Sequence, residues 1–129
     1  EKILFDGENL ISVWLALGDE RKSNGCLYVI PGSHRLAVNS DRYDDHLFLK
    51  SNDLENKRLL NKAKAVELKK GEVLFFHSRL FHAAGRNNTS ETKLSVVFTY
   101  HESGNNPIVG SRSAEQPSIQ ISRASKSDK

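Results

Sequence analysis

The 129-residue sequence contains no methionine, a single cysteine and no apolar run long enough to cross a membrane. Because methionine is missing, we expect that residue 1 is not the natural start of the polypeptide. The single cysteine, Cys26, excludes an internal disulfide and is typical of a reducing compartment. No segment has the pattern of a secretion signal. We therefore expect a cytoplasmic protein without a membrane partner, in which Cys26 is a buried structural thiol.

Apolar and aromatic residues are also few, at 37% and 8% of the sequence, which is low for a compact domain. Segment 111–129 explains part of this, because it consists mostly of Ser, Arg, Lys, Gln and Asp. We expect this polar tail to be disordered. Several positive charges behind the net charge of +3 lie in it, and a solvated tail explains them better than a nucleic-acid partner does. Residues 1–110 are enough for one domain.

Short apolar segments separated by Gly, Pro and Asn predict a mainly β fold. The expected strands are residues 10–17, 26–30, 65–68, 72–76 and 93–100. A short helix is expected through Leu54, Leu59 and Leu60, capped by Asn52 or Asp53. Residues 18–25 have the composition of a turn that ends in Asn-Gly. Short strands without long helices favour a jelly-roll, or double-stranded β-helix, over an α/β arrangement.

Two of these strands have faces of different polarity. In strand 10–17, Ser12, Trp14 and Ala16 lie opposite the more apolar face. The apolar face of strand 93–100 consists of Leu94, Val96, Phe98 and Tyr100, and its more polar face consists of Lys93, Ser95, Val97 and Thr99. A barrel that holds a charged ligand would direct the polar face inward. An edge strand with its polar face in water has the same alternation, so both interpretations stay open.

Two stretches carry most of the information about function. One runs from Val13-Trp-Leu-Ala-Leu17 to Asn24-Gly-Cys-Leu-Tyr-Val-Ile-Pro-Gly-Ser-His-Arg35, and the other from Gly71-Glu-Val-Leu-Phe-Phe-His-Ser-Arg-Leu-Phe-His-Ala-Ala-Gly-Arg-Asn87 to Tyr100. Together they resemble the second half of the phytanoyl-CoA dioxygenase family, whose members are non-haem iron(II) oxygenases dependent on 2-oxoglutarate. The resemblance implies a cupin-like double-stranded β-helix that hydroxylates a small organic substrate with molecular oxygen.

The resemblance also implies three iron ligands, a His-x-Asp pair and a later His, which leave open positions on the metal. Only the later ligand has a match, at His82. We therefore expect the pair, and the N-terminal portion of the fold, to lie upstream of Glu1, and the isolated chain to be inactive. His77 is the second choice, although residues five apart on a strand face opposite sides. His34, in a Pro-Gly-Ser-His turn, is better suited to a structural hydrogen bond.

The distal carboxylate of 2-oxoglutarate needs a cation when it is buried. The resemblance assigns this role to Lys93, with Ser95 beside it on the strand and Trp14 lining the pocket. Lys93 stands where relatives usually have Arg, and it offers a point charge in place of a bidentate fork. Ala84 stands where some relatives have a Ser that helps to hold the co-substrate. Arg86 is the next cation to consider.

The sequence is consistent with three functions. The first is hydroxylation of a small molecule, with substrate contacts from the irregular segment 36–62. The second is a halogenase of the same fold, in which a small residue replaces the upstream carboxylate. The third is a non-catalytic jelly-roll binding module, which the departures at Lys93 and Ala84 favour.

Overall fold

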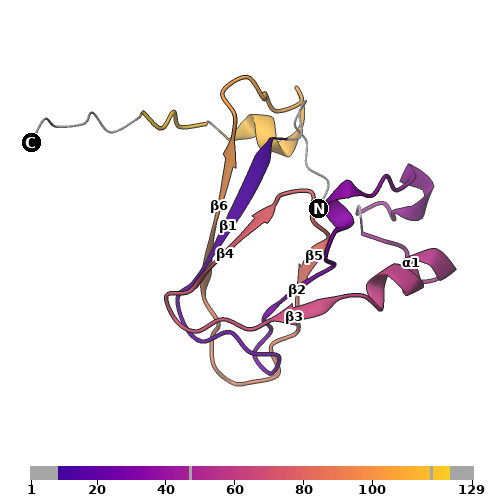
Figure 1. Cartoon of the computed structure of the whole chain (residues 1–129), viewed down its shortest axis with the longest axis vertical. Helices are drawn as coiled ribbons and strands as arrows, with labels where there is room; N and C mark the ends of the chain where they lie inside the picture. Colours follow the sequence, from indigo (N-terminus) through magenta and orange to yellow (C-terminus); the bar gives the residue numbers. More distant parts are fainter. Residues whose placement is uncertain (1–8, 47, 117, 123–129) are drawn as a thin grey trace, which may run out of the picture.

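The computed structural model describes residues 9–46, 48–116 and 118–122, which form two antiparallel sheets (Figure 1). The first sheet has the order β4-β1-β6, built from Val73–His77, Leu10–Ala16 and Ser95–His101. The second has the order β3-β2-β5, built from Lys64–Val66, Leu27–Val29 and His82–Ala84. The mainly β class predicted from the sequence is confirmed.

Strand β1 is central to the first sheet because it pairs with β4 on one side and β6 on the other. Ser12 lies opposite Phe76 of β4, and Ala16 lies opposite Ser95 of β6, with Trp14 between them on the same face. Directly paired residues in an antiparallel sheet share a face. Because Ser12 and Ala16 are buried, this is the inner face of the sheet. The inner face therefore carries Trp14 and Ser95.

The outer face of the first sheet is apolar and exposed in the part of the chain that the structure describes. Phe75 of β4 is 67% exposed. Ile11 of β1 and Phe98 and Tyr100 of β6 lie on the same face, and the exposed fraction of each is above 40%. The apolar side of the predicted strand 93–100 is thus the outer one. Of the two orientations left open for that strand, the structure supports the one that directs Ser95 inward.

The second sheet contains a strand that the sequence did not predict. No strand was expected between residues 76 and 93, but His82 and Ala84 pair with Val29 and Leu27 of β2. The small residues Gly25 and Gly85 instead allow the two backbone segments that carry them to approach closely. Gly25 has φ +86°, and a Cβ there would lie 2.6 Å from the carbonyl oxygen of Gly85. The predicted strands 65–68 and 72–76 also lie in different sheets, as β3 and β4.

The predicted short helix is confirmed as α1, Leu54–Leu60. Asp53 caps it, because the Asp53 carboxylate accepts a hydrogen bond of 2.7 Å from the backbone amide of Asn56. Asn56 is fully buried and donates its side-chain amide to the carbonyls of Arg42 and Lys50. These bonds join α1 to residues 42 and 50, and α1 lies beside the second sheet (Figure 1).

The remaining regular segments are short. They are the 3₁₀ helices Ser33–Arg35, Ser40–Arg42 and Arg112–Glu115. The last of these lies in the segment predicted to be a polar tail, of which residues 117 and 123–129 are outside the described residues. Within the described ranges, no helix has the length and apolar character that crossing a bilayer requires.

Candidate co-substrate and metal site

Three side chains predicted to bind the co-substrate converge on the carboxylate of Glu20. The Trp14 indole N–H donates to both Glu20 oxygens, at 3.0 and 3.1 Å. The Ser95 hydroxyl donates to Oε1 at 2.7 Å, and the Lys93 ammonium lies 3.4 Å from Oε2. Lys93 Nζ also lies 3.1 Å from the Ser95 oxygen. The structure therefore brings Trp14, Lys93 and Ser95 together around one carboxylate.

Glu20 lies in the turn predicted over residues 18–25, but its side chain is buried there, which the sequence did not predict. Its exposed fraction is 0%, because its backbone N–H and C=O both pair with Leu68, at 2.7 and 3.0 Å. This isolated bridge fixes residue 20 against the chain leading out of β3 and directs its side chain into the domain. The turn 18–25 has no apolar periodicity, so nothing in its local sequence marks the buried position.

The charge of Glu20 is compensated within the cluster. The Lys93 side chain is 13% exposed, so the ion pair with Glu20 is largely removed from water. The ammonium also lies 5.0 Å from the centroid of the Trp14 ring, within the range of a cation–π contact. Every buried side-chain N or O atom in the described residues has a hydrogen-bond partner. The cluster is thus a complete carboxylate-binding site, with donors from β1, from the first residue of β6 and from the chain that leads into β6.

His82 is held by contacts that leave one ring nitrogen available. Its Nδ1 lies 2.7 Å from the backbone carbonyl oxygen of Leu80. A carbonyl oxygen only accepts, so Nδ1 carries the proton and the lone pair of Nε2 is free in the neutral ring. A metal-binding histidine is commonly oriented by such a bond from its other nitrogen. The donor chemistry of His82 therefore fits a metal ligand.

Phe76 connects His82 with the inner face of the first sheet. The His82 and Phe76 rings meet edge to face, with centroids 5.0 Å apart. Phe76 is paired with Ser12, on the face of β1 that also carries Trp14. His82, from the second sheet, therefore faces the interior across which Trp14 lies, although it does not touch the Glu20 cluster.

The other predicted histidines have structural contacts. His77 Nδ1 accepts a hydrogen bond of 3.1 Å from the backbone N–H of Arg79. The His34 and His77 rings are stacked with centroids 5.2 Å apart. The sequence predicted a structural hydrogen bond for His34, and the contact that the structure shows for its ring is this stacking on His77. Among the described residues, no group of three or more His, Cys, Asp or Glu side chains could hold a metal ion.

Cys26 is fully buried, which agrees with its predicted structural role. Burial raises the pKa of the Cys26 thiol, and the negative charges of Glu67 and Glu20 raise it further. A thiol with a raised pKa is a poor nucleophile at neutral pH, because little thiolate is present. Cys26 therefore takes no part in the candidate site.

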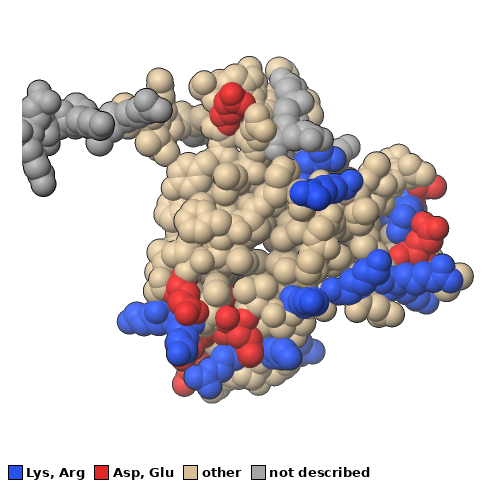
Figure 2. Space-filling model, in the orientation of Figure 1, with Lys and Arg blue, Asp and Glu red and all other residues tan. Residues whose placement is uncertain are grey.

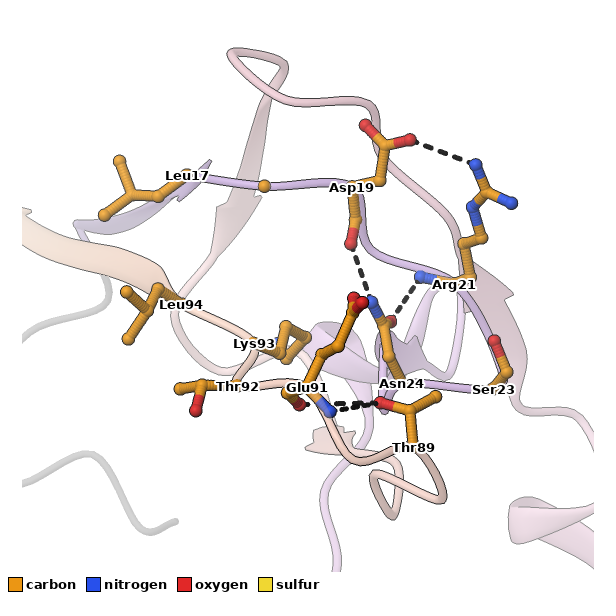
Figure 3. A pocket seen from close by; sticks show the side chains of 11 residues that line it. Leu17, Asp19, Arg21, Ser23, Asn24, Thr89, Glu91, Thr92, Lys93 and Leu94 are labelled. Atoms are coloured by element: carbon orange, nitrogen blue, oxygen red, sulfur yellow. Dashed lines mark hydrogen bonds and ion pairs between the residues drawn. The ribbon is translucent and has the colours of Figure 1, made fainter.

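A surface depression of about 500 Å³ lies beside the Glu20 cluster, lined by parts of segments 17–24 and 89–94 (Figure 3). Asp19 and Arg21 line the depression and form an ion pair of 3.1 Å. Glu20, which lies between them in the sequence, does not line it. Lys93 also lines the depression and is shared with the cluster. Figure 2 shows charged side chains gathered over these lower loops and over α1, while the region over β1, β4 and β6 is largely uncharged. The depression is a polar outer surface of the turn that carries Glu20.

Comparison with known proteins identifies the family. Residues 3–95 match the family model described as phytanoyl-CoA dioxygenase (PhyH). The chain belongs to the phytanoyl-CoA dioxygenase family. It is 31% identical over 94 residues to the peroxisomal phytanoyl-CoA dioxygenase of Homo sapiens, which covers 67% of this chain and 27% of that protein. It is 33% identical over 86 residues to phytanoyl-CoA dioxygenase 1 of Oryza sativa subsp. japonica, covering 64% and 29%.

Solved structures support the predicted double-stranded β-helix. The epimerase SnoN in complex with Fe3+, alpha ketoglutarate and nogalamycin RO is 27% identical, with a TM-score of 0.65 over 82% of this chain and 41% of that one. EctD from S. alaskensis with bound Fe is 26% identical, with a TM-score of 0.59 over 71% and 31%. The chain spans less than one third of the length of the curated relatives above. The family is one of iron(II)- and 2-oxoglutarate-dependent oxygenases, and this chain has part of their fold.

Proposed function

We propose that the protein containing this chain is an iron(II)- and 2-oxoglutarate-dependent dioxygenase that hydroxylates a small organic molecule. The observation that carries the proposal is the convergence of Trp14, Lys93 and Ser95 on a carboxylate. The resemblance in sequence assigns Lys93 and Ser95 to the distal carboxylate of 2-oxoglutarate and Trp14 to the lining of the same pocket. Iron and 2-oxoglutarate, when bound, supply the oxidation of a substrate C–H bond by oxygen, with release of succinate and carbon dioxide.

His82 would contribute one ligand to the iron. Its Nδ1–H is held by the Leu80 carbonyl, which orients the ring and leaves Nε2 to bind the metal. Phe76 packs against the ring and excludes water from one side of it. The remaining ligands would come from outside the described residues, which lack a cluster of three metal-binding side chains.

Lys93, Ser95 and Trp14 would hold the distal carboxylate of 2-oxoglutarate. Lys93 supplies the positive charge that a buried carboxylate requires, and the Ser95 hydroxyl and Trp14 indole supply two further donors. Relatives in the family usually have arginine at the position of Lys93. The lysine ammonium is a compact point charge and cannot form the paired hydrogen bonds of a guanidinium group. The indole and hydroxyl donors compensate for part of that lost geometry.

The non-catalytic alternative is favoured by one observation, the occupation of this donor set by Glu20. In a protein that does not bind 2-oxoglutarate, the ion pair between Lys93 and Glu20 would be a permanent part of the structure. The two functions differ in one measurable property, which is the conversion of 2-oxoglutarate to succinate.

The test is succinate release by the full-length protein supplied with iron(II), ascorbate, oxygen and 2-oxoglutarate. We expect iron-dependent succinate formation in the wild type, none in His82→Ala and retained formation in His77→Ala, whose imidazole lies nearby but is not assigned to the metal. Absence of succinate from a folded, iron-loaded wild type would support the non-catalytic alternative.

A further inference from the structure

Glu20 occupies the site where the co-substrate carboxylate is expected. Its Oε1 accepts from Trp14 and Ser95, and its Oε2 accepts from Trp14 and lies within ion-pair distance of Lys93. Both oxygens are therefore engaged by the donors that were predicted to bind 2-oxoglutarate. The side chain is completely shielded from water.

A second carboxylate has no compensating charge at this position. Among the described residues, the Lys93 ammonium is the one cation paired with the Glu20 carboxylate, and the other donors in contact with it are neutral. Placing the distal carboxylate of 2-oxoglutarate beside Glu20 would put two negative charges against one positive charge in a buried site. Like charges that share a buried site disfavour each other strongly. Glu20 and the co-substrate carboxylate therefore exclude one another.

We infer that Glu20 is a built-in competitor for 2-oxoglutarate, which binds at Lys93 only when the Glu20 side chain leaves the cluster. The inference rests on the proposed function, because it names what controls access to the co-substrate site. It also accounts for the lysine at position 93: a flexible, compact ammonium can pair with either carboxylate, whereas the planar fork of arginine is more demanding in geometry.

The backbone limits how this exchange can occur. The N–H and C=O of Glu20 are both bonded to Leu68, so the main chain at this position is held in place. The exchange therefore requires rotation of the Glu20 side chain and not unfolding of the turn. Lys93 stays partly accessible at 13% exposure, and it lines the outer depression as well, so a ligand carboxylate can approach it while Glu20 rotates away.

The experiment measures binding of glutarate to the full-length protein without iron. Glutarate has the two carboxylates of 2-oxoglutarate but lacks the keto group, so its affinity does not depend on metal chelation or turnover. We expect Glu20→Gln and Glu20→Ala to bind glutarate about tenfold or more tightly than the wild type, because each frees Lys93 from its internal anion. Asp19→Asn is the matched control, because it removes one negative charge from the adjacent exposed residue and leaves the cluster unchanged.

A thermal-unfolding measurement on the same proteins gives a second readout. Removing Glu20 leaves a buried cation, so added glutarate should raise the melting temperature of Glu20→Ala by more than it raises that of the wild type at the same glutarate concentration. Adding Lys93→Ala to Glu20→Ala should abolish both the gain in affinity and the rescue. Equal glutarate affinity in the wild type and in folded Glu20 variants would overturn the inference.

The wild type provides a test that needs no Glu20 variant to fold. The Trp14 indole ¹⁵N–H resonance, assigned by loss of the signal in Trp14→Phe, reports on the bond to Glu20. We expect it to shift as glutarate saturates the protein, because binding displaces Glu20. Saturation without any shift would contradict the inference. Succinate formation is not used in these tests, so failure of the oxygenase proposal would leave their outcomes interpretable.

Discussion

The ion pair between Lys93 and Glu20 should contribute far more to stability than a surface pair. In Lys93→Met, the fully buried Glu20 carboxylate loses its cation and keeps only neutral donors. Removing one partner of a buried pair costs about 3–5 kcal/mol. Because the Lys93 side chain is 13% exposed, we place the expected loss near the lower end, at about 3 kcal/mol. With a urea slope of about 2 kcal/mol per molar, the unfolding midpoint should fall by about 1.5 M.

Arg21→Met is the matched control for this measurement. Arg21 pairs with Asp19 at 3.1 Å, but the two side chains are 67% and 51% exposed. Such a pair contributes about 0–1 kcal/mol, so its loss should shift the midpoint little. The double variant Lys93→Met with Glu20→Gln should recover much of the loss, because it leaves no unpaired buried charge. A loss in Lys93→Met as small as that in Arg21→Met would refute the buried, charged cluster.

Two further predictions concern other parts of the chain. Gly25→Ala should reduce the free energy of unfolding by about 2 kcal/mol or more, because residue 25 has φ +86° and the new Cβ would meet the Gly85 carbonyl oxygen. Gly18→Ala is the control. A Cβ at residue 18 meets no atom within 4 Å, so this change should alter the free energy of unfolding by about 0.5 kcal/mol or less. Equal losses in urea unfolding would contradict this account of β2 and β5. Cys26 should react slowly with iodoacetamide at pH 8 in the folded protein and rapidly in urea, because its burial raises the thiol pKa; equal rates would show an accessible thiolate.

The same raised pKa gives a sign for the dependence of stability on pH. The folded state favours the neutral Cys26 thiol, so its contribution is fully present below the unfolded pKa of about 9.0. As pH rises above that value, the unfolded state releases the proton first and the folded state loses relative stability. A Cys26→Ser variant should lack this alkaline decline, as measured by urea unfolding across pH 8 to 10.

Regular alternation and caps were enough to predict most of the secondary structure. Strand β1 was predicted within one residue, because alternating apolar side chains over seven residues have few other interpretations. The helix α1 was predicted from its leucines and from a cap at Asn52 or Asp53, and the structure has the cap at Asp53. Strand β5 was not, because three residues are too few for a periodic signal and Ala83, Ala84 and Gly85 also suit a turn. Its pairing with β2 depends on a partner about 55 residues earlier in the chain, as in Leu27 with Ala84.

The candidate site was predicted in part. The resemblance to the family selected Trp14, Lys93 and Ser95, and the structure places them in one cluster. It could not reveal Glu20, because a charged residue in a polar turn has no local sign of burial. Glu20 is buried through its pairing with Leu68, a contact between segments nearly fifty residues apart. The one signal available in the sequence was the grouping of a cation with two further hydrogen-bond donors, which favours a carboxylate, internal or bound, at the same place.

Anaerobic binding of iron(II), measured by equilibrium dialysis of the full-length protein, tests the central claim most directly. The account predicts stoichiometric binding in the wild type and in His77→Ala, because His77 makes its contacts with Arg79 and His34 and is not assigned to the metal. It predicts that His82→Ala loses affinity by about a hundredfold or more, since a direct ligand contributes at least as much as the groups that orient it. Unchanged iron affinity in a folded His82→Ala variant would contradict the account.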